Sequence, residues 1–166
     1  MMKFLVVIED NRGSVHRMSK EAIAGAQKLG GNVTALVLGA NAESLAQELS
    51  SVEIDKTLIV NHDMVLTYNS DGYTEVVTKV IQSIDPDVII AGHSYQTRDF
   101  MPRVSARLNI PFIPDVIMVE GDNYTKQILN AKLNCKISSS SEKKIISFQS
   151  ACFSDEDMQS LSLIHI

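Results

Sequence analysis

Three arginines around one expected helix are the side chains in this chain best suited to hold an anion. Arg98, Arg103 and Arg107 lie in the stretch TRDFMPRVSARL, which follows the apolar run DVIIAG ending at Gly92. In open parallel sheets, ligands bind beyond the carboxyl ends of the strands, where the N–H groups at the start of a helix attract negative charge. The arginines could therefore hold a phosphate, pair with carboxylates of another domain or subunit, or stay solvated.

The start of this helix weakens the phosphate alternative. We expect the helix over residues 100–108, with Asp99 as its N-cap and Pro102 in its first turn, where no backbone N–H is needed. An aspartate at the N-cap occupies N–H donors that a bound anion would use. The residues alone thus favour a contact or solvated role for Arg103 and Arg107 over a bound phosphate.

The chain lacks the common motifs of catalysis and nucleotide binding. It contains no G-x-G-x-x-G or G-x-x-x-x-G-K-[ST] loop, no G-x-S-x-G elbow and no H-E-x-x-H pair. The four histidines are scattered, and the two cysteines, Cys135 and Cys152, lack the CxxC spacing of a zinc or redox site. A small hydrolase or ligase would need such a cluster, so we expect no catalytic and no metal-ligating residues.

Composition limits the partners and the compartment. A net charge of −5 on 166 residues differs from the basic surface that nucleic-acid binders carry. The apolar runs are far shorter than the ~20 residues needed to cross a bilayer. The N-terminus resembles neither a signal peptide nor a transit peptide. We therefore expect a cytoplasmic protein that binds no nucleic acid and inserts into no membrane.

Apolar runs alternate with helical patterns up to Leu108. The expected strands are residues 3–8, 32–39, 56–60 and 87–92, and a helix separates each from the next, the first of them capped by Ser14. Continuous apolar strands that alternate with helices predict an α/β fold with a three-layer, doubly wound and mostly parallel sheet of the nucleotide-binding type.

The pattern changes after Pro111. The stretches FIPDVIMVEG, YTKQILNAKLNCKIS and KKIISFQS are typical of strands and have no helix between them. Parallel neighbours need a long crossover connection, whereas antiparallel strands can follow each other through short turns. We therefore expect extra antiparallel or mixed strands near the C-terminus, added at one edge of the sheet.

The segment TRDFMPRVSARLNIPFIPDV resembles the N-terminal domain of the electron transfer flavoprotein alpha subunit. The similarity extends over about residues 3–153 and includes the opening FLVVIED, the turn and strand GGNVTALVLG and the late strands AKLNCKISSSSEKKIISFQSACF. The residues of the central segment that match the family are Thr97, Asp99, Phe100, Pro102, Arg103, Ala106, Leu108, Pro114, Asp115 and Val116.

The resemblance implies a subunit of an electron carrier and not an enzyme. Such proteins are heterodimers of alpha and beta subunits that pass electrons from flavin dehydrogenases to a membrane quinone oxidoreductase. FAD is held mainly by the C-terminal domain of the alpha subunit, whereas the N-terminal domain is chiefly scaffold for the beta-subunit interface. The candidates for interface or pocket contacts are then Gly92, Thr97, Arg98, Asp99, Pro102, Arg103 and Arg107.

The chain departs from the family at its C-terminus. We expect the N-terminal α/β domain over residues 1–153, the start of an interdomain linker over 154–159 and a non-native tail over 160–166, with a natural tail as the alternative. We expect the FAD-binding domain, with its glycine-rich signature, to be missing from this fragment. No flavin contact therefore carries over, and we expect no cofactor for this fragment alone.

A stand-alone adenine-nucleotide-binding module of the stress-protein-like kind is the second interpretation. Such modules share the fold class and usually show a late G-x-x-G loop followed by serine or threonine. The corresponding stretch here, LNCKISSSSEKK, supplies serines without glycines, which favours the electron-carrier interpretation. The electron donor, the pathway branch (fatty-acid oxidation among them) and binding of AMP by a residual pocket remain open at this point.

Overall fold

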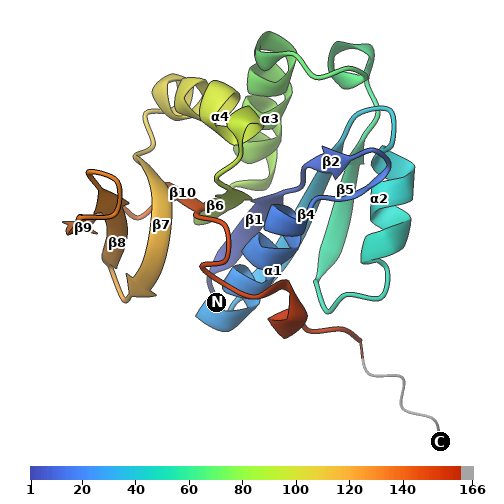
Figure 1. The fold of residues 1–166 in the computed structure, drawn as a ribbon. Coiled ribbons are helices and arrows are strands. Elements are labelled where there is room, and N and C mark those ends of the chain that lie inside the picture. The colour runs from blue at the N-terminus through green and yellow to red at the C-terminus, as the bar shows by residue number, and fades with distance from the viewer. Residues whose placement is uncertain (162–166) are drawn as a thin grey trace, which may run out of the picture.

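One large sheet organises the molecule, of which the computed structural model describes residues 1–161. Over these residues it has eight strands in the order β5-β4-β1-β6-β10-β7-β8-β9 (Figure 1). Its strands are β1 (Lys3–Val7), β4 (Asn32–Leu38), β5 (Lys56–Val60), β6 (Val88–Gly92), β7 (Phe112–Glu120), β8 (Asn123–Ile128), β9 (Leu133–Ser138) and β10 (Lys144–Phe148).

The α-helices of the described residues cover both faces of this sheet. Side chains of α1 (Arg17–Leu29) and α2 (Ala42–Leu49) pack with one face of the strands, and those of α3 (Ser70–Ile84) and α4 (Tyr95–Leu108) pack with the other. This confirms the three-layer, mostly parallel α/β fold. No helix among residues 1–161 is long and apolar enough to cross a bilayer. The shorter elements are β2 (Asp10–Asn11), β3 (Ser14–Val15), η1 (Asp63–Val65) and η2 (Asp155–Asp157).

The central strands are apolar throughout because both of their faces are covered. In β1, Phe4 and Val6 join the cluster beneath α1 and α2, whereas Leu5 and Val7 join the cluster beneath α3 and α4. Alternate side chains of a strand point to opposite faces, so both sets must be apolar. The continuous apolar run of the sequence follows directly from this arrangement.

The strands after Pro111 divide into two groups. As expected, β8 and β9 are antiparallel and form one edge of the sheet. In contrast, β10 runs parallel between β6 and β7, in the interior of the sheet. All of its residues are buried, Lys144 and Ser147 among them.

Strand β7 changes partner along its length. Its first half pairs in parallel with β10, and its second half pairs antiparallel with β8. Asp115 lies at this change with φ of 59°, and the register shifts on both sides of Val116. Such an irregularity bends a strand. The second half of β7 therefore carries β8 and β9 away from the helices (Figure 1).

The first helix begins later than expected. Ser14 lies in β3 and its hydroxyl donates to the carbonyl oxygen of Asn11, so its expected role as helix cap was wrong. His16 caps α1 instead, because its Nδ1 accepts the N–H of Met18 at 3.1 Å. The turn at Gly13, with φ of 92°, folds the preceding loop into a small hairpin and delays the helix by two residues.

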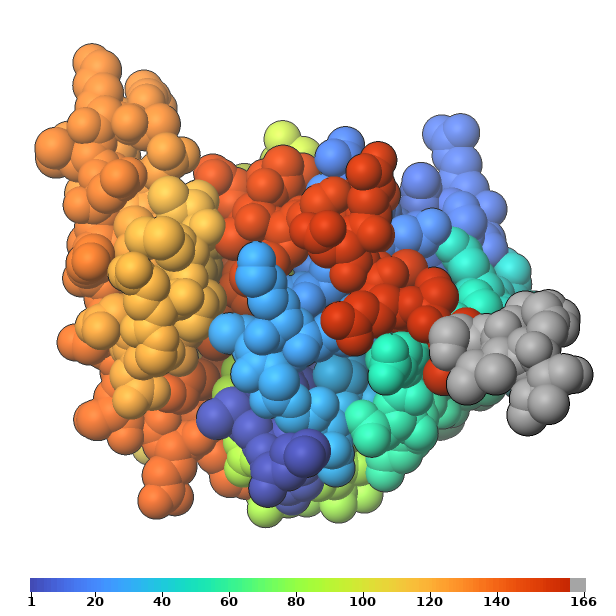
Figure 2. Space-filling model, turned by 90° about the horizontal axis from the view of Figure 1, so that it is seen from below, coloured from blue at the N-terminus to red at the C-terminus, as the bar shows by residue number. Residues whose placement is uncertain are grey.

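The residues after β10 pack across α1 rather than leaving the domain (Figure 2). Ala151 donates its N–H to the buried carboxylate of Glu21 at 2.9 Å, and Gln159 exchanges hydrogen bonds with the side chain of Gln27. Ser160 then forms a β-bridge with Val52. Most of residues 154–161 thus contact the domain, and their role as an interdomain linker stays a prediction. Of the expected tail, residues 162–166 lie outside the described part of the chain.

Replacement of Gly25 by alanine tests the packing of this segment. A Cβ at Gly25 would lie 2.8 Å from ring atoms of Phe148 and Phe153. In a helix interior Gly→Ala normally stabilises by about 1 kcal/mol, whereas overpacking destabilises by roughly 1–3 kcal/mol. We expect Gly25→Ala to lower the free energy of unfolding in urea. The cost should shrink in a Phe153→Ala background, and a gain in stability of the single variant would contradict this packing.

Candidate functional site

Helix α1 closes one side of the corner at the end of β6. Gly92 is buried there, and a Cβ added to it would lie 2.6 Å from the Cβ of Met18 in α1. Glycine is needed because the helix backbone approaches the end of the strand closely. The sequence correctly placed Gly92 at the end of its strand, but what approaches this glycine is a helix of the same domain.

Helix α4 starts five residues before the expected position, at Tyr95, and Ser94 is its N-cap. The Ser94 hydroxyl oxygen accepts the N–H of Thr97 at 3.1 Å, and Thr97 is itself buried. Asp99 was expected to cap this helix; that prediction was wrong, since Asp99 lies inside it. The hydroxyl of Ser94, further upstream, can cap the helix, and Thr97 is buried. The residues before Phe100 therefore join the helix as an extra turn.

Pro102 lies in the interior of α4 and not in its first turn as expected. The Pro102 ring is exposed, so it displaces no side chain of the core. The missing N–H leaves the carbonyl oxygen of Arg98 without its usual helical partner, which normally destabilises a helix. The sequence signal of proline near a helix start was therefore misleading, because the turn before it is helical as well.

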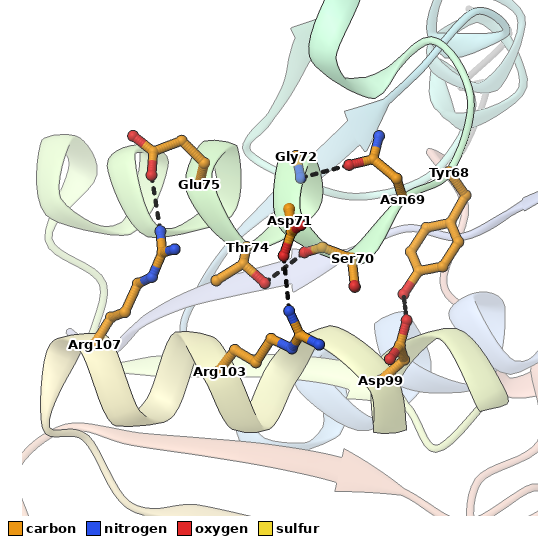
Figure 3. Close-up of polar contacts among 10 residues, drawn as sticks. All are labelled: Tyr68, Asn69, Ser70, Asp71, Gly72, Thr74, Glu75, Asp99, Arg103 and Arg107. Atoms are coloured by element: carbon orange, nitrogen blue, oxygen red, sulfur yellow. Dashed lines mark hydrogen bonds and ion pairs between the residues drawn. The ribbon is translucent and has the colours of Figure 1, made fainter.

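The two arginines of α4 pair with carboxylates of α3 in the same domain (Figure 3). Arg103 contacts Asp71 at 2.8 Å, and Arg107 contacts Glu75 at 2.7 Å. Hydrogen bonds from Lys79 and then Arg107 lower the pKa of the Glu75 carboxyl. All of these side chains are at least partly exposed, so the pairs add little stability, but they align the two helices.

This pairing was missed because partners within the domain were not considered. The signal was nevertheless present in the sequence. Asp71 and Glu75 are four residues apart on one helix, as Arg103 and Arg107 are on the other. Residues at this spacing share a helix face, so two acids on α3 could have been matched with two bases on α4.

Asp99 forms a hydrogen bond with a tyrosine that the sequence did not single out. The Tyr68 hydroxyl donates to the Asp99 carboxylate at 2.5 Å, as Figure 3 shows. Burial, together with the hydrogen bond and the charge of Asp99, raises the pKa of Tyr68 above its ordinary value. The Tyr68 ring meets Tyr73 edge-on at 4.8 Å, and Tyr73 meets Phe100 in the same manner. Asp99 thus fixes the loop before α3 to α4.

A cavity of about 450 Å³ opens at the carboxyl edge of the sheet, beside the first turn of α4. Its charged lining is Glu9, Arg98 and Asp115, so two carboxylates face one guanidinium. This balance disfavours a phosphate, which needs an excess of positive charge or free N–H donors. The remaining lining residues are His16, Met18, His93, Ser94, Tyr95, Gln149 and Ser150.

Two of the lining residues are held by a hydroxyl in the core. The fully buried Ser147 hydroxyl oxygen accepts the N–H of Asp115 at 3.2 Å and lies 2.8 Å from Nδ1 of His93. Burial lowers the pKa of His93, while the charge of Asp115 opposes that shift. The Ser147 hydroxyl thus links His93, which follows β6, to the bend of β7.

Arg98 is the arginine of this segment that lies at the mouth of the cavity. Its guanidinium lies 5.6 Å from the centre of the Tyr95 ring, and that ring is 89% exposed. An exposed tyrosine with an arginine beside it is a pair of residue types enriched at protein contacts. Of the seven candidate residues, Arg98 therefore fits a contact role best, whereas Gly92, Thr97, Asp99, Arg103 and Arg107 make contacts within the domain.

The described residues provide little catalytic chemistry. Residues 1–161 contain no group of three or more His, Cys, Asp or Glu side chains placed to hold a metal ion. Burial raises the pKa of the Cys152 thiol to about 11, so it is protonated at neutral pH and a poor nucleophile. What the corner can do is bind helices together and present Tyr95 and Arg98.

Replacement of Ser94 by alanine tests the helix start. Loss of the N-cap hydroxyl should lower the free energy of unfolding by about 1 kcal/mol, while Ser94→Thr, which keeps an acceptor, should cost less. Urea denaturation followed by circular dichroism measures both variants. Equal stability of Ser94→Ala and the unchanged chain would show that the helix is capped elsewhere.

Alkaline titration tests the bond between Tyr68 and Asp99. The pKa of Tyr68 in the folded chain is raised above its ordinary value of 10.0, so its contribution to stability is full below that pH and is lost as pH rises further. We expect the unchanged chain to lose more stability above pH 10.0 than Tyr68→Phe, measured by urea unfolding at a series of pH values. In ultraviolet titration Asp99→Asn should lower the pKa of Tyr68. An unchanged titration curve in this variant would count against the bond.

Comparisons with known proteins agree with this domain. The electron transfer flavoprotein domain family matches residues 4–161. The electron transfer flavoprotein subunit alpha of Bacillus subtilis is 35% identical over 136 residues, which are 78% of this chain and 42% of that protein. A probable mitochondrial alpha subunit of Caenorhabditis elegans is 30% identical over 90% of the chain and 46% of its own length. The chain thus spans less than half the length of these curated relatives, and it belongs to the electron transfer flavoprotein family.

Proposed function

We propose that this chain is the N-terminal domain of an electron transfer flavoprotein alpha subunit and acts as scaffold and subunit interface without a redox site of its own. In the complete heterodimer, electrons would pass from flavin dehydrogenases to a quinone oxidoreductase through FAD held elsewhere. The match to alpha subunits over most of the chain supports the family role. The proposed partner is the electron transfer flavoprotein beta subunit, and the proposed location is the cytoplasm.

The observation that carries the scaffold role is that the polar side chains of the α4 segment are used by contacts within the domain. Ser94 satisfies a first-turn N–H of α4, and Arg103 and Arg107 are paired with α3. A site that binds a ligand tightly needs polar groups free to meet it. These groups instead hold the helices of the domain to one another, which supports a structural purpose for the signature segment.

The residues present do not fit a flavin dinucleotide. FAD carries a pyrophosphate, and the cavity at the carboxyl edge presents the carboxylates Glu9 and Asp115 to it. The arginine of that cavity, Arg98, lies over the Tyr95 ring instead. We therefore assign FAD, in the parent protein, to residues beyond this domain, and we propose a domain over residues 1–153 with the following residues leading toward the flavin domain.

A stand-alone adenine-nucleotide-binding module is the second candidate, and one observation favours it. The cavity of about 450 Å³ lies at the carboxyl edge of a parallel sheet and within the size range of small-molecule sites. The acidic lining and the capped helix start count against it. Calorimetric titration with AMP and ATP separates the two candidates. We expect no measurable heat of binding, and tight binding of either nucleotide would favour the module.

A binding experiment tests the proposed function. The chain should be purified colourless when expressed alone and should be retained by an affinity-tagged beta subunit when the two are expressed together. A small, unrelated acidic protein that carries the same tag replaces the beta subunit as the control for retention by charge alone. A yellow chain with stoichiometric flavin, or failure of the beta subunit to retain the chain, would contradict the proposal.

A further inference from the structure

Lys144 is buried at the start of β10, on the face of the sheet that α1 covers. It shares this face with Ile146 and Phe148, because alternate side chains of a strand point the same way. Only 7% of the residue is exposed. Lysine is almost never buried to this degree unless its ammonium group is paired. Burial of the charge at this position costs free energy that an apolar residue would not cost.

The contacts of this ammonium group within the described residues are long. Its Nζ lies 3.5 Å from Oδ1 of Asp122 and 3.4 Å from the carbonyl oxygen of Ser139, whereas N–H···O hydrogen bonds are normally about 2.7–3.2 Å long. The Asp122 side chain is 80% exposed, so water weakens its attraction for the lysine. Nζ also lies 5.7 Å from the centre of the Tyr124 ring. An ammonium group has three donors, and the domain itself satisfies those of Lys144 weakly.

Lys144 lines a pocket of about 350 Å³ between the end of α1 and the turn that joins β7 to β8. Figure 2 shows the light-blue end of α1 beside the yellow-orange residues of β7. Met2 and Leu29, which are 50% and 36% exposed, continue the apolar lining to the surface. Within the pocket the lining includes the core residues Phe4, Val88, Tyr124 and Ile146. The volume lies within the range of small-molecule sites.

We propose that this pocket binds a small carboxylate with a short hydrocarbon body. The carboxylate group binds the ammonium group of Lys144, and the hydrocarbon body packs against the core residues of the lining. Small-molecule sites commonly combine an apolar lining with a few polar groups that fix the orientation of the ligand. A buried charge attracts its partner more strongly than an exposed one, because less water screens it. The site goes beyond the scaffold role proposed above and does not depend on it.

Two carboxylates in the lining restrict the charge of the ligand. Asp122 and Glu142 are both exposed, and they repel a dianion such as a phosphate monoester. An organic cation is disfavoured because the buried charge is positive. Oδ1 of Asp122 occupies the position of a ligand oxygen at the long distance of 3.5 Å. A carboxylate that enters the pocket replaces it at normal hydrogen-bond length, so Asp122 is a competitor within the domain.

Titration of the chain with small carboxylates tests this site. We expect hexanoate to shift the backbone amide signals of Gly121, Asp122 and Tyr124 in NMR spectra and to leave those of Tyr95 and Arg98, in the other cavity, unchanged. Each methylene added between acetate and hexanoate should tighten binding about fourfold, as expected from the burial of one methylene. Hexanamide has nearly the same shape without the charge and should bind at least about tenfold more weakly.

Three variants test the role of each charge. Lys144→Met keeps an unbranched side chain and should lower the affinity for hexanoate at least about tenfold. Its urea midpoint should not fall, because an apolar residue of similar volume often replaces a buried charge without loss of stability. Asp122→Asn removes the competing carboxylate and should tighten binding. Glu142→Gln removes an equal charge that forms no ion pair with Lys144 within the described residues, and should tighten binding less.

The outcomes that overturn the proposal are separate for each part of the ligand. Equal binding of hexanoate and hexanamide would exclude the ammonium group as the anchor, and equal binding of hexanoate and acetate would exclude the apolar lining. Absence of shifts at high hexanoate concentration, or shifts confined to residues outside the pocket, would exclude the site itself. If Lys144→Met does not fold, an affinity of Asp122→Asn no higher than that of the unchanged chain contradicts the proposal.

Discussion

The insertion of β10 between β6 and β7 is the interaction on which the remaining architecture depends. Every residue of β10 is buried, and it pairs in parallel with both neighbours. Its Ser147 hydroxyl holds both His93, after β6, and Asp115, at the bend of β7. Because β10 occupies this position, β7 must turn away to find β8, and the residues after β10 must cross α1. The projecting hairpin and the packed C-terminal segment are therefore two consequences of one strand insertion.

The signature segment around α4 has its physical explanation in the contacts between helices. Asp99 binds Tyr68, while Arg103 and Arg107 bind carboxylates of α3, and Phe100 packs in the core beneath both helices. The signature segment thus fixes the position of α4 relative to α3. Tyr95 and Arg98, at the mouth of the cavity, remain exposed.

Sequence periodicity predicted the sheet and helices well because parallel strands and amphipathic helices have strong local patterns. Periodicity could not place β10, because a short apolar strand has the same sequence pattern at the edge and in the interior of a sheet. Its position between β6 and β7 depends on contacts between residues that lie far apart in the sequence. Periodicity also misplaced Asp99 and Pro102, because several residues before α4 could cap it and burial of Thr97 selected Ser94. Local sequence rules could not predict the left-handed backbone at Leu129, where φ is 52°, because leucine disfavours that conformation. Matching the acids of α3 with the bases of α4 was possible from spacing alone.

Hydrogen–deuterium exchange of the chain, free and bound to the beta subunit, tests the central claim most directly. That claim is that contacts within the domain engage the signature segment of α4 and that the domain serves as a subunit interface. The account predicts that β10, α3 and the interior turns of α4 exchange at the same rate in both states, whereas binding slows exchange at the first turn of α4, beside Tyr95 and Arg98. Unchanged exchange throughout the chain in the presence of the beta subunit, or protection confined to α3 and the interior turns of α4, would contradict it.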